Sequence, residues 1–479
     1  MATVEAPATT ERIFLAGEWM ASAASFDVRS PYSGDIVATV ARADADEARR
    51  AIDAAAEAMR SPLPPWRRAD ILERVAQLLR ERGEELARTI CAEAGKPIKA
   101  ARVEAARAVN TFALAAGEAR RLAGESVPIS GTQPGDGHIA WTVRVPIGVI
   151  GAITPFNFPL NLVAHKLAPA LAAGCAVVLK PASQTPLSAL RLAALYEEAE
   201  LPTGWLSVLP GRADEIGAVL VEDERVRMLT FTGSAEVGWR LRSRAARKKV
   251  ALELGNASPV LVEPDADLEL ATAKVATHAF SFAGQTCVSI QRVYVHRDVL
   301  DDFLARLVPK VEALQVGDPA ADGTDVGPVV DRGNHERISA WLEEATSGGA
   351  EVVTGGFEED GLLRPTVLRG VTPDMKVCSQ EIFGPVCSVI PYGSLDEAFD
   401  LANGTEYGLQ ASIFTRSIEP AVRASQALEF GSVMINEAPE WRADQMPYGG
   451  TKASGNTKEG PAYTVREMTE ERLIVLGGV

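Results

Sequence analysis

The sequence has few cysteines and an excess of negative charge. Its five cysteines among 479 residues show no CxxC spacing, which suggests neither a disulfide framework nor a zinc site. We therefore expect no bound metal and a reducing compartment. A formal net charge of −16 argues against nucleic acid or an anionic membrane as a partner, because both bind basic surfaces.

Long apolar runs and a targeting leader are also missing. Segment 1–14, MATVEAPATTERIF, lacks a basic stretch followed by an apolar one, so it does not look like a secretion signal. The most apolar stretch, 145–179, is interrupted by prolines, asparagines, a histidine and a lysine within the roughly 20 residues that a membrane helix needs. These absences predict a cytoplasmic protein in which 145–179 belongs to a buried core.

The first 125 residues are predicted to be mainly helical after a strand-like opening at 12–20. An Asp-rich cap and the spacing of apolar residues predict three helical segments, within 44–60, 66–95 and 98–124. Residues 125–146 then alternate short segments with Pro and Gly turns, which indicates an extended hairpin or arm. A strand-like segment within 463–478 is expected to pair with this arm or with another subunit.

From residue 148 the sequence repeats one unit, a short apolar run followed by a turn and an amphipathic helix. The runs GVIGAIT, AVVLKPA, LSVLPG, RMLTFTG and VALELG begin at residues 148, 176, 206, 227 and 250. This alternation predicts a mostly parallel sheet covered on both faces, with ligands at the carboxyl ends of its strands. A second set of α/β signals begins near residue 259 and contains Cys287.

Seven short motifs occur in one order along the chain. They are TPFNFP (154–159), KPASQTP (180–186), FTGSAEVG (231–238), ELGN (253–256), GQTC (284–287), EIFGPV (381–386) and PYGGTKASG (447–455). In these motifs the chain resembles the aldehyde dehydrogenase superfamily over nearly its whole length. The resemblance implies an α/β fold with a parallel-sheet cofactor domain, an α/β catalytic domain and a small oligomerisation arm. These correspond, in order, to residues 1–122 with 143–253, to 254–462, and to 123–142 with 463–479.

The resemblance gives the central motifs a chemical role. Oxidation of an aldehyde by hydride transfer first needs a nucleophile that adds to the carbonyl carbon, and Cys287 is the candidate. Asn157 and the backbone N–H of Cys287 would stabilise the oxyanion, and Glu253 would activate the water that hydrolyses the thioester. The implied reaction converts a small aldehyde to the free acid. Glu253 also separates the chain from the coenzyme A-acylating branch.

The cofactor cannot be inferred from the common dinucleotide fingerprint, because no GxGxxG motif follows a strand. The resemblance instead implies that NAD(P) binds to Thr154, Pro155, Phe156, Lys180, Ser183, Arg212, Gly233, Ser234, Leu254, Glu381 and Phe383. Many NAD-preferring members have glutamate where this chain has Ser183. Serine does not repel a 2′-phosphate, and Lys180 and Arg212 would attract one. We expect NADP to be accepted and preferred, the alternative being that Ser183 only relaxes selectivity.

Three further residues are candidates for the substrate site. Arg107 and Arg292 could bind an anionic group of the substrate, and His165 could line the substrate funnel. The alternative for Arg292 is that it anchors the catalytic loop. Asn256 stands where the family commonly has glycine, so its side chain could narrow the space near the nicotinamide.

Two other functions stay open at this point. A cysteine with an oxyanion hole and a general base would also cleave esters, which describes a non-redox thiol esterase. A catalytically silent binding member of the fold is the second alternative. The arm implies a homodimer or a homotetramer.

Overall fold

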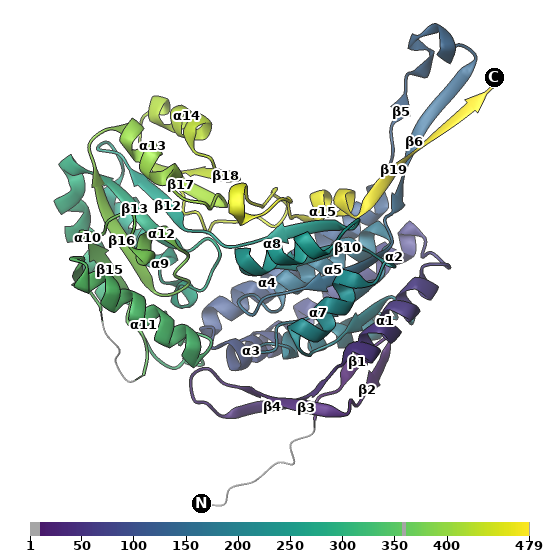
Figure 1. Ribbon diagram of the computed structural model, residues 1–479, viewed down its shortest axis with the longest axis horizontal. Coiled ribbons are helices and arrows are strands. Elements are labelled where there is room, and N and C mark those ends of the chain that lie inside the picture. The colour runs from purple at the N-terminus through teal and green to yellow at the C-terminus, as the bar shows by residue number, and fades with distance from the viewer. Residues whose placement is uncertain (1–9, 357–360, 479) are drawn as a thin grey trace, which may run out of the picture.

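The computed structural model describes residues 10–356 and 361–478. Segment 1–14 is predicted not to be a secretion signal, and its residues 1–9 lie outside the described part. Figure 1 shows two lobes with an arm that projects from the first lobe. Within the described ranges, no helix is long and apolar enough to cross a membrane.

The first lobe is built on a seven-stranded sheet. Its strands are, in spatial order, β11 (Lys249–Glu253), β10 (Val226–Thr232), β7 (Val149–Ile153), β8 (Val177–Lys180), β9 (Leu206–Val208), β1 (Ile13–Leu15) and β2 (Glu18–Met20). The strands from β11 to β9 are parallel, and each lies within one of the five predicted apolar runs or begins one residue before it. Strand β7 lies between β10 and β8, so the strand order reverses there, and such a point is where ligands bind.

Nine helices and a shared core complete the described part of the first lobe. They are α1 (Ala45–Ala58), α2 (Pro65–Glu81), α3 (Gly83–Ala94), α4 (Ile98–Arg121), α5 (Asn161–Ala173), α6 (Leu187–Glu198), α7 (Ala213–Glu222), α8 (Ala235–Arg244) and α15 (Pro461–Glu467). Asp44 and Glu47 form a capping box at α1, which confirms the predicted Asp-rich cap. Helix α5 is buried along its whole length, so the apolar segment before residue 180 is core, as predicted.

The second lobe contains a separate seven-stranded sheet and its own core. Its strands are, in spatial order, β14 (Glu351–Thr354), β15 (Thr366–Arg369), β16 (Val386–Tyr392), β13 (Ile290–His296), β12 (Ser258–Val262), β17 (Gln410–Phe414) and β18 (Ser432–Ile435). Its helical elements are α9 (Leu268–His278), η3 (Ser281–Gly284), η4 (Arg297–Val299), α10 (Leu300–Glu312), α11 (Arg332–Ser347), α12 (Lys376–Ser379), α13 (Leu395–Asn403) and α14 (Ile418–Ala427). After β18 the chain returns to the first lobe through η5 (Lys452–Ser454).

The arm is a three-stranded antiparallel sheet. Strand β6 (His138–Pro146) pairs with β5 (Ser126–Val127) on one side and with β19 (Thr469–Gly477) on the other, and two short turns, η1 (Ile129–Gly131) and η2 (Gln133–Gly135), complete it. The predicted hairpin and the predicted pairing of the C-terminal strand with it are both confirmed (Figure 1).

Two features of the fold differ from the sequence prediction. A hairpin of β3 (Ala24–Arg29) and β4 (Ile36–Arg42) precedes the first helix, although this region was expected to be mainly helical. Helix α15 was divided between the catalytic domain and the arm, yet it packs on α4 and α5, and Val465 belongs to the core of the first lobe. Burial of this apolar residue is the reason that α15 stays with that lobe.

Candidate active site

The predicted catalytic residues meet where the two lobes join. Asn157 follows the carboxyl end of β7, and Glu253 is the last residue of β11. Cys287 comes from the second lobe, between η3 and β13. Cys287, Glu253 and Leu254 line both of two adjoining cavities, of about 310 and 530 Å³. The smaller one is called the substrate-side cavity here, and the larger one the cofactor-side cavity.

The loop that carries Cys287 is strained and held from outside. Phe282 and Ala283 have left-handed backbone conformations, with φ of 46° and 52°, which cost energy for residues other than glycine. The side chain of Gln285 donates to the carbonyl of Phe282 and accepts from the backbone N–H of Val330. These hydrogen bonds fix the backbone that leads into the thiol.

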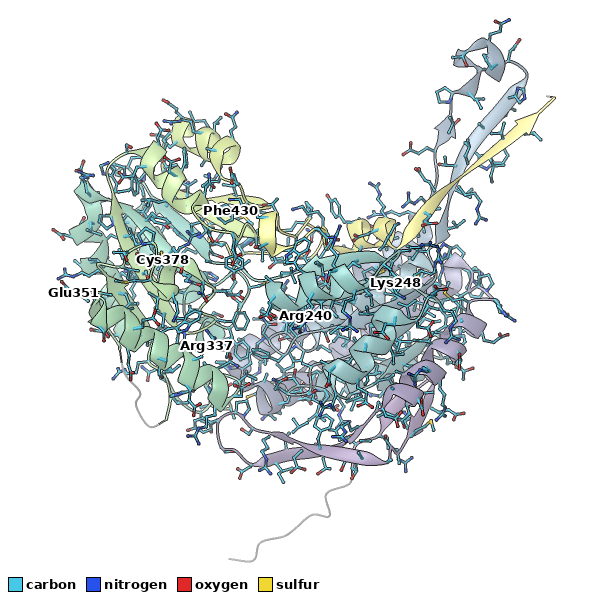
Figure 2. The ribbon with its side chains drawn as sticks, viewed as in Figure 1. Arg240, Lys248, Arg337, Glu351, Cys378 and Phe430 are labelled. Carbon is cyan, nitrogen blue, oxygen red and sulfur yellow. The ribbon has the colours of Figure 1, made fainter. Side chains whose placement is uncertain are left out.

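The Cys287 thiol faces a phenol. Its Sγ lies 2.8 Å from the hydroxyl of Tyr448. Burial raises the pKa of Cys287 to about 12, and the hydrogen bond with Tyr448 acts in the opposite direction. The pKa of Cys378 is also raised by burial, but Figure 2 places Cys378 inside the second lobe, away from the junction.

Asn157 is positioned against the same loop. Its Nδ2 donates to the carbonyl of Gln285, two residues before Cys287, at 3.0 Å. The side chain is buried and its Oδ1 has no hydrogen-bond partner. An amide held in this way supplies N–H donors without titrating, which is what a developing oxyanion beside the thiol requires.

Glu253 is a buried carboxyl group with unusual electrostatics. Neither of its oxygens has a hydrogen-bond partner. Burial, followed by the negative charge of Glu459, raises the pKa of Glu253 well above its ordinary value. A Cβ at Gly449 would lie 2.7 Å from Oε1 of Glu253, so a larger residue there would displace the carboxyl group. This environment favours the neutral acid and gives Glu253 the proton affinity of a general base.

Glu459 is a second buried carboxyl group that interacts with Glu253 and with nearby cationic side chains. Burial by itself would raise the pKa of Glu459, but His165, Lys166 and Arg442 lower it to about 2. Its carboxylate lies 3.6 Å from Nζ of Lys166 and 3.0 Å from Nη2 of Arg442. The pKa values of these two neighbouring carboxyl groups are therefore shifted in opposite directions.

The cofactor-side cavity is lined by Pro155, Phe156, Gly233, Ser234, Leu254, Glu381 and Phe383 of the predicted set. The rings of Phe156 and Phe383 pack edge to face, with centroids 5.8 Å apart. The carboxyl group of Glu381 accepts from the backbone N–H of Asn256 at 2.9 Å, and burial raises its pKa to about 7. Figure 2 shows Arg337, another lining residue, on α11 where the second lobe meets the first.

Two polar features of this cavity, at Ser234 and Thr232, fit a dinucleotide. Ser234 is the N-cap of α8 but its side chain forms no capping bond, so this helix start presents donors to an anion such as pyrophosphate. The hydroxyls of Thr154 and Thr232 are buried without partners, and Thr232 lines the cavity. These observations are compatible with the predicted cofactor.

The residues predicted for the adenosine end lie beyond this cavity. Lys180 ends β8 and is buried, which lowers its pKa to about 8. The Ser183 hydroxyl donates to the carbonyl of Gly211 at 3.1 Å. Arg212, the next residue, is exposed and paired with Asp214. Ser183 and Arg212 are therefore close in space, joined through Gly211.

The substrate predictions have different outcomes. Arg107 lines the substrate-side cavity, where its guanidinium pairs with Asp444 at 2.9 Å. His165 is fully buried, within 3.4 Å of Asp444 and of Arg442. It therefore contacts these two charged groups and is not among the residues that line the cavity. This corrects the expectation that His165 lines the funnel.

Arg292 does not face the substrate. It is the largest fully buried side chain of the described residues, and its guanidinium donates to the carbonyls of Ala257, Leu401 and Ala402. With a further bond to the hydroxyl of Tyr294, these contacts make Arg292 an anchor inside the second lobe. The anion-binding role is therefore wrong, and the partners are not residues of the catalytic loop that the alternative named.

Asn256 does not narrow the cofactor-side cavity either. Its side chain is buried and bonds to Ser258, to the carbonyl of Gln410 and to the backbone N–H of Leu409. The amide thus ties β12 to β17, and only its backbone N–H reaches Glu381.

Sequence reasoning did not single out Lys96, Arg442 and Tyr448, which all line the substrate-side cavity. Tyr448 lies inside the motif PYGGTKASG, so a signal for it existed. Lys96 and Arg442 lie outside the seven motifs, and only the fold brings them to the thiol. Among residues 10–356 and 361–478, no group of three or more His, Cys, Asp or Glu is arranged to hold a metal ion.

The chain is similar to known proteins over nearly its whole length. The sequence profile of the aldehyde dehydrogenase family matches residues 19–474. The 3-sulfolactaldehyde dehydrogenase of Priestia aryabhattai is 45% identical over 464 residues, which are 97% of each chain.

Two solved structures share the fold. Aldehyde dehydrogenase 21 from Physcomitrella patens, in complex with the reaction product succinate, has a TM-score of 0.95 and 38% identity over 99% of each chain. Glyceraldehyde-3-phosphate dehydrogenase from Methanocaldococcus jannaschii, complexed with NADP, has a TM-score of 0.91 and 39% identity over 94% of this chain and 99% of its own. The chain belongs to the aldehyde dehydrogenase family.

Proposed function

We propose that this protein oxidises a short aldehyde to the carboxylic acid with NAD(P), through a covalent intermediate on Cys287. The observation that carries the proposal is the convergence of Cys287, Asn157 and Glu253 at the junction of two cavities. One cavity has the polar features of a dinucleotide site, and the other is a small pocket that ends at the thiol.

The first step forms a bond between Sγ of Cys287 and the carbonyl carbon. The electron pair of the C=O bond moves to oxygen, and Asn157 stabilises that oxyanion as one donor, a contribution worth roughly 3 kcal/mol. The bound NAD(P) supplies a hydride acceptor at the cofactor-side cavity. Residues Glu381 and Phe383 of the second lobe would orient it, because both line that cavity.

The second step hydrolyses the thioester. Glu253 takes a proton from a water molecule, the water oxygen bonds to the acyl carbon, and Sγ of Cys287 leaves as the thiolate. The unpartnered oxygens of Glu253 leave lone pairs for this water. The products are the carboxylic acid and the restored nucleophile.

We infer that the aldehyde is small and anionic. Arg107 and Arg442 both line the substrate-side cavity, and Nε of Arg442 is buried without a hydrogen-bond partner. A buried guanidinium donor is best satisfied by a charged oxygen. The names of two similar proteins refer to 3-sulfolactaldehyde and to the product succinate, which supports an anionic substrate for this chain.

We also propose that NADP is preferred over NAD, as the serine at position 183 suggests. A similar protein is complexed with NADP, which supports its use here. Five free cysteines favour a reducing, cytoplasmic location. The arm favours a homodimer or homotetramer.

The test is a panel of anionic and neutral aldehydes with each cofactor, followed by absorbance of the reduced cofactor. Cys287→Ala should abolish oxidation of every aldehyde, whereas the matched control Cys378→Ala should retain it. Ester cleavage without any cofactor-dependent oxidation would favour the thiol esterase, and inactivity in both assays would favour a silent binding protein.

A second variant tests whether the substrate is anionic. Arg107→Gln should lower kcat/KM for anionic aldehydes by about 10- to 100-fold, the range of a hydrogen bond to a charged group. Neutral aldehydes of the same length should change by less than about threefold. An equal loss for both classes would contradict anion recognition by Arg107.

A further inference from the structure

We propose that Tyr448 is an additional catalytic residue, whose hydroxyl donates a hydrogen bond to the Cys287 thiolate, and that Arg442 strengthens this donor through the Tyr448 ring. The inference rests on the proposed role of Cys287 as the nucleophile. The carrying observations are the 2.8 Å between the hydroxyl of Tyr448 and Sγ of Cys287, and the Arg442 guanidinium 4.0 Å from the ring centroid.

The phenol is fixed in place before any substrate binds. Tyr448 is 4% exposed and packs with Val288 and Leu409. Its backbone forms a two-way bridge with Glu459, in which each N–H donates to the other carbonyl. A donor held this rigidly loses little conformational entropy when it bonds to the sulfur.

The charges around the sulfur explain why a donor is needed. Two carboxyl groups, Glu253 and Glu381, oppose a negative charge on Cys287, while Arg442 and the Tyr448 hydroxyl favour it. Glu459 neutralises part of the charge on Arg442. The hydroxyl is the group in direct contact with the sulfur, so its bond is the strongest local support for the thiolate.

Arg442 acts through Tyr448. A cation over an aromatic face withdraws electron density from the ring, which makes the phenolic O–H a better donor. In the thiol form either atom can donate, but a thiolate has no proton, so Tyr448 alone can supply the hydrogen bond in the reactive state. Arg442 therefore supports the thiolate through Tyr448 in addition to its direct electrostatic effect on the sulfur.

The size of the effect follows from two opposing terms. A hydrogen bond to a charged group changes the thiolate population by about 10- to 100-fold. A thiolate stabilised in this way is less nucleophilic, with a Brønsted coefficient of about 0.5. The rate constant of each thiolate therefore falls by roughly the square root of the gain in thiolate population. The net effect of losing the hydroxyl is a rate about 3- to 10-fold lower wherever the thiol form predominates.

The experiment measures alkylation of Cys287 by the neutral reagent iodoacetamide, in the intact protein without aldehyde or cofactor. Mass spectrometry of tryptic peptide 275–292, which holds a single cysteine, isolates this thiol from the other four. In Tyr448→Phe, Cys287 should be alkylated about 3- to 10-fold more slowly than in wild type, over the pH range in which the alkylation rate rises with pH. The control is Tyr463→Phe, at a half-exposed tyrosine of α15, which should leave the profile unchanged.

The sign of the change decides between the proposal and its alternatives. A packing role for Tyr448, or a hydroxyl that only accepts from the thiol, predicts equal or faster alkylation in Tyr448→Phe, and either result would overturn the proposal. Unchanged thermal unfolding shows that the variant is folded. Oxidation that survives in Cys287→Ala would refute the proposed function, whereas the alkylation profile would still report on Tyr448.

Discussion

The ammonium group of Lys96 forms a fully buried ion pair with the carboxylate of Glu104. The same ammonium lies 3.6 Å from the ring centroid of Phe158 and 4.7 Å from that of Phe282. Glu104 in turn accepts from the backbone N–H of Leu160 at the start of α5. One ion pair thus joins the segment after Asn157 to the loop before Cys287.

Replacement of Lys96 by methionine should therefore destabilise the protein strongly. It leaves a buried carboxylate without its cation, a change that costs about 3 to 5 kcal/mol. Thermal unfolding should show a midpoint lower by several degrees. Lys99→Met, three residues later at the start of α4, is the matched control, because Lys99 and Asp325 form a partly exposed pair and surface pairs contribute about 0 to 1 kcal/mol. Equal midpoints for the two variants would contradict a supporting role for the buried pair.

Glu253→Gln should separate the two halves of the reaction. The variant should give a single-turnover burst of reduced cofactor and then lose steady-state turnover, because only hydrolysis needs the base. Rapid-mixing absorbance measures both phases. Absence of the burst would assign Glu253 a role before hydride transfer.

The same variant should be more stable than wild type at high pH. The pKa of Glu253 is raised in the folded state above its ordinary value of 4.5, so the folded protein binds a proton that the unfolded chain releases. Wild-type stability then falls as pH rises above 4.5, by up to about 1.4 kcal/mol per pH unit. Glutamine cannot ionise, so the difference in unfolding midpoint should grow from pH 5 to pH 8. A constant difference would show that Glu253 does not titrate with folding.

Ser183→Glu should change the choice of cofactor. A carboxylate beside Gly211 would repel the 2′-phosphate of NADP and bind the 2′-hydroxyl of NAD. We expect the ratio of kcat/KM for NADP to that for NAD to fall by at least about tenfold. Ser183→Ala serves as the control, since it removes the hydroxyl without adding charge. A wild type that ignores NADP, or an unchanged ratio in Ser183→Glu, would refute this interpretation of the pocket.

The arm should hold copies of the chain together. Its exposed side chains include Ile139, Trp141, Leu473 and Val475, an unusual apolar content for a projecting sheet. Sedimentation should show a dimer or tetramer, and Leu473→Asp should shift it toward smaller species. The exposed Val352→Asp of the second lobe is the control. A wild-type monomer would contradict the prediction.

Local patterns predicted the framework well. The strands that end near Asn157 and Glu253 follow from short apolar runs, because a strand buried on both faces is apolar throughout. The C-terminal strand was paired with the arm for a similar reason, since neither had a sheet of its own. The β3–β4 hairpin was missed although the segment ASFDVR of β3 alternates apolar and polar residues, because the partner segment IVATVAR of β4 does not.

Contacts between distant segments could not be predicted. Tyr448 lies 161 residues from Cys287, and no local rule brings a phenol to a thiol across that interval. Arg292 was misread because its carbonyl partners come from α13 and from the start of β12. Burial of a guanidinium depends on such partners, which sequence spacing does not reveal.

The division of the site between two sheets has a consequence for recombination among relatives. Residues 258–435 form the second lobe as one uninterrupted stretch, so a single exchange would transfer the nucleophile with its strained loop. The host would keep Asn157 and Glu253 together with Arg107, Arg442 and Tyr448, whereas Glu381 and Phe383 of the cofactor-side cavity would come from the donor. Chimeras cut at these two points would combine the cavity arginines and Tyr448 of the host with the thiol loop of the donor, so they would test whether the two parts fit together.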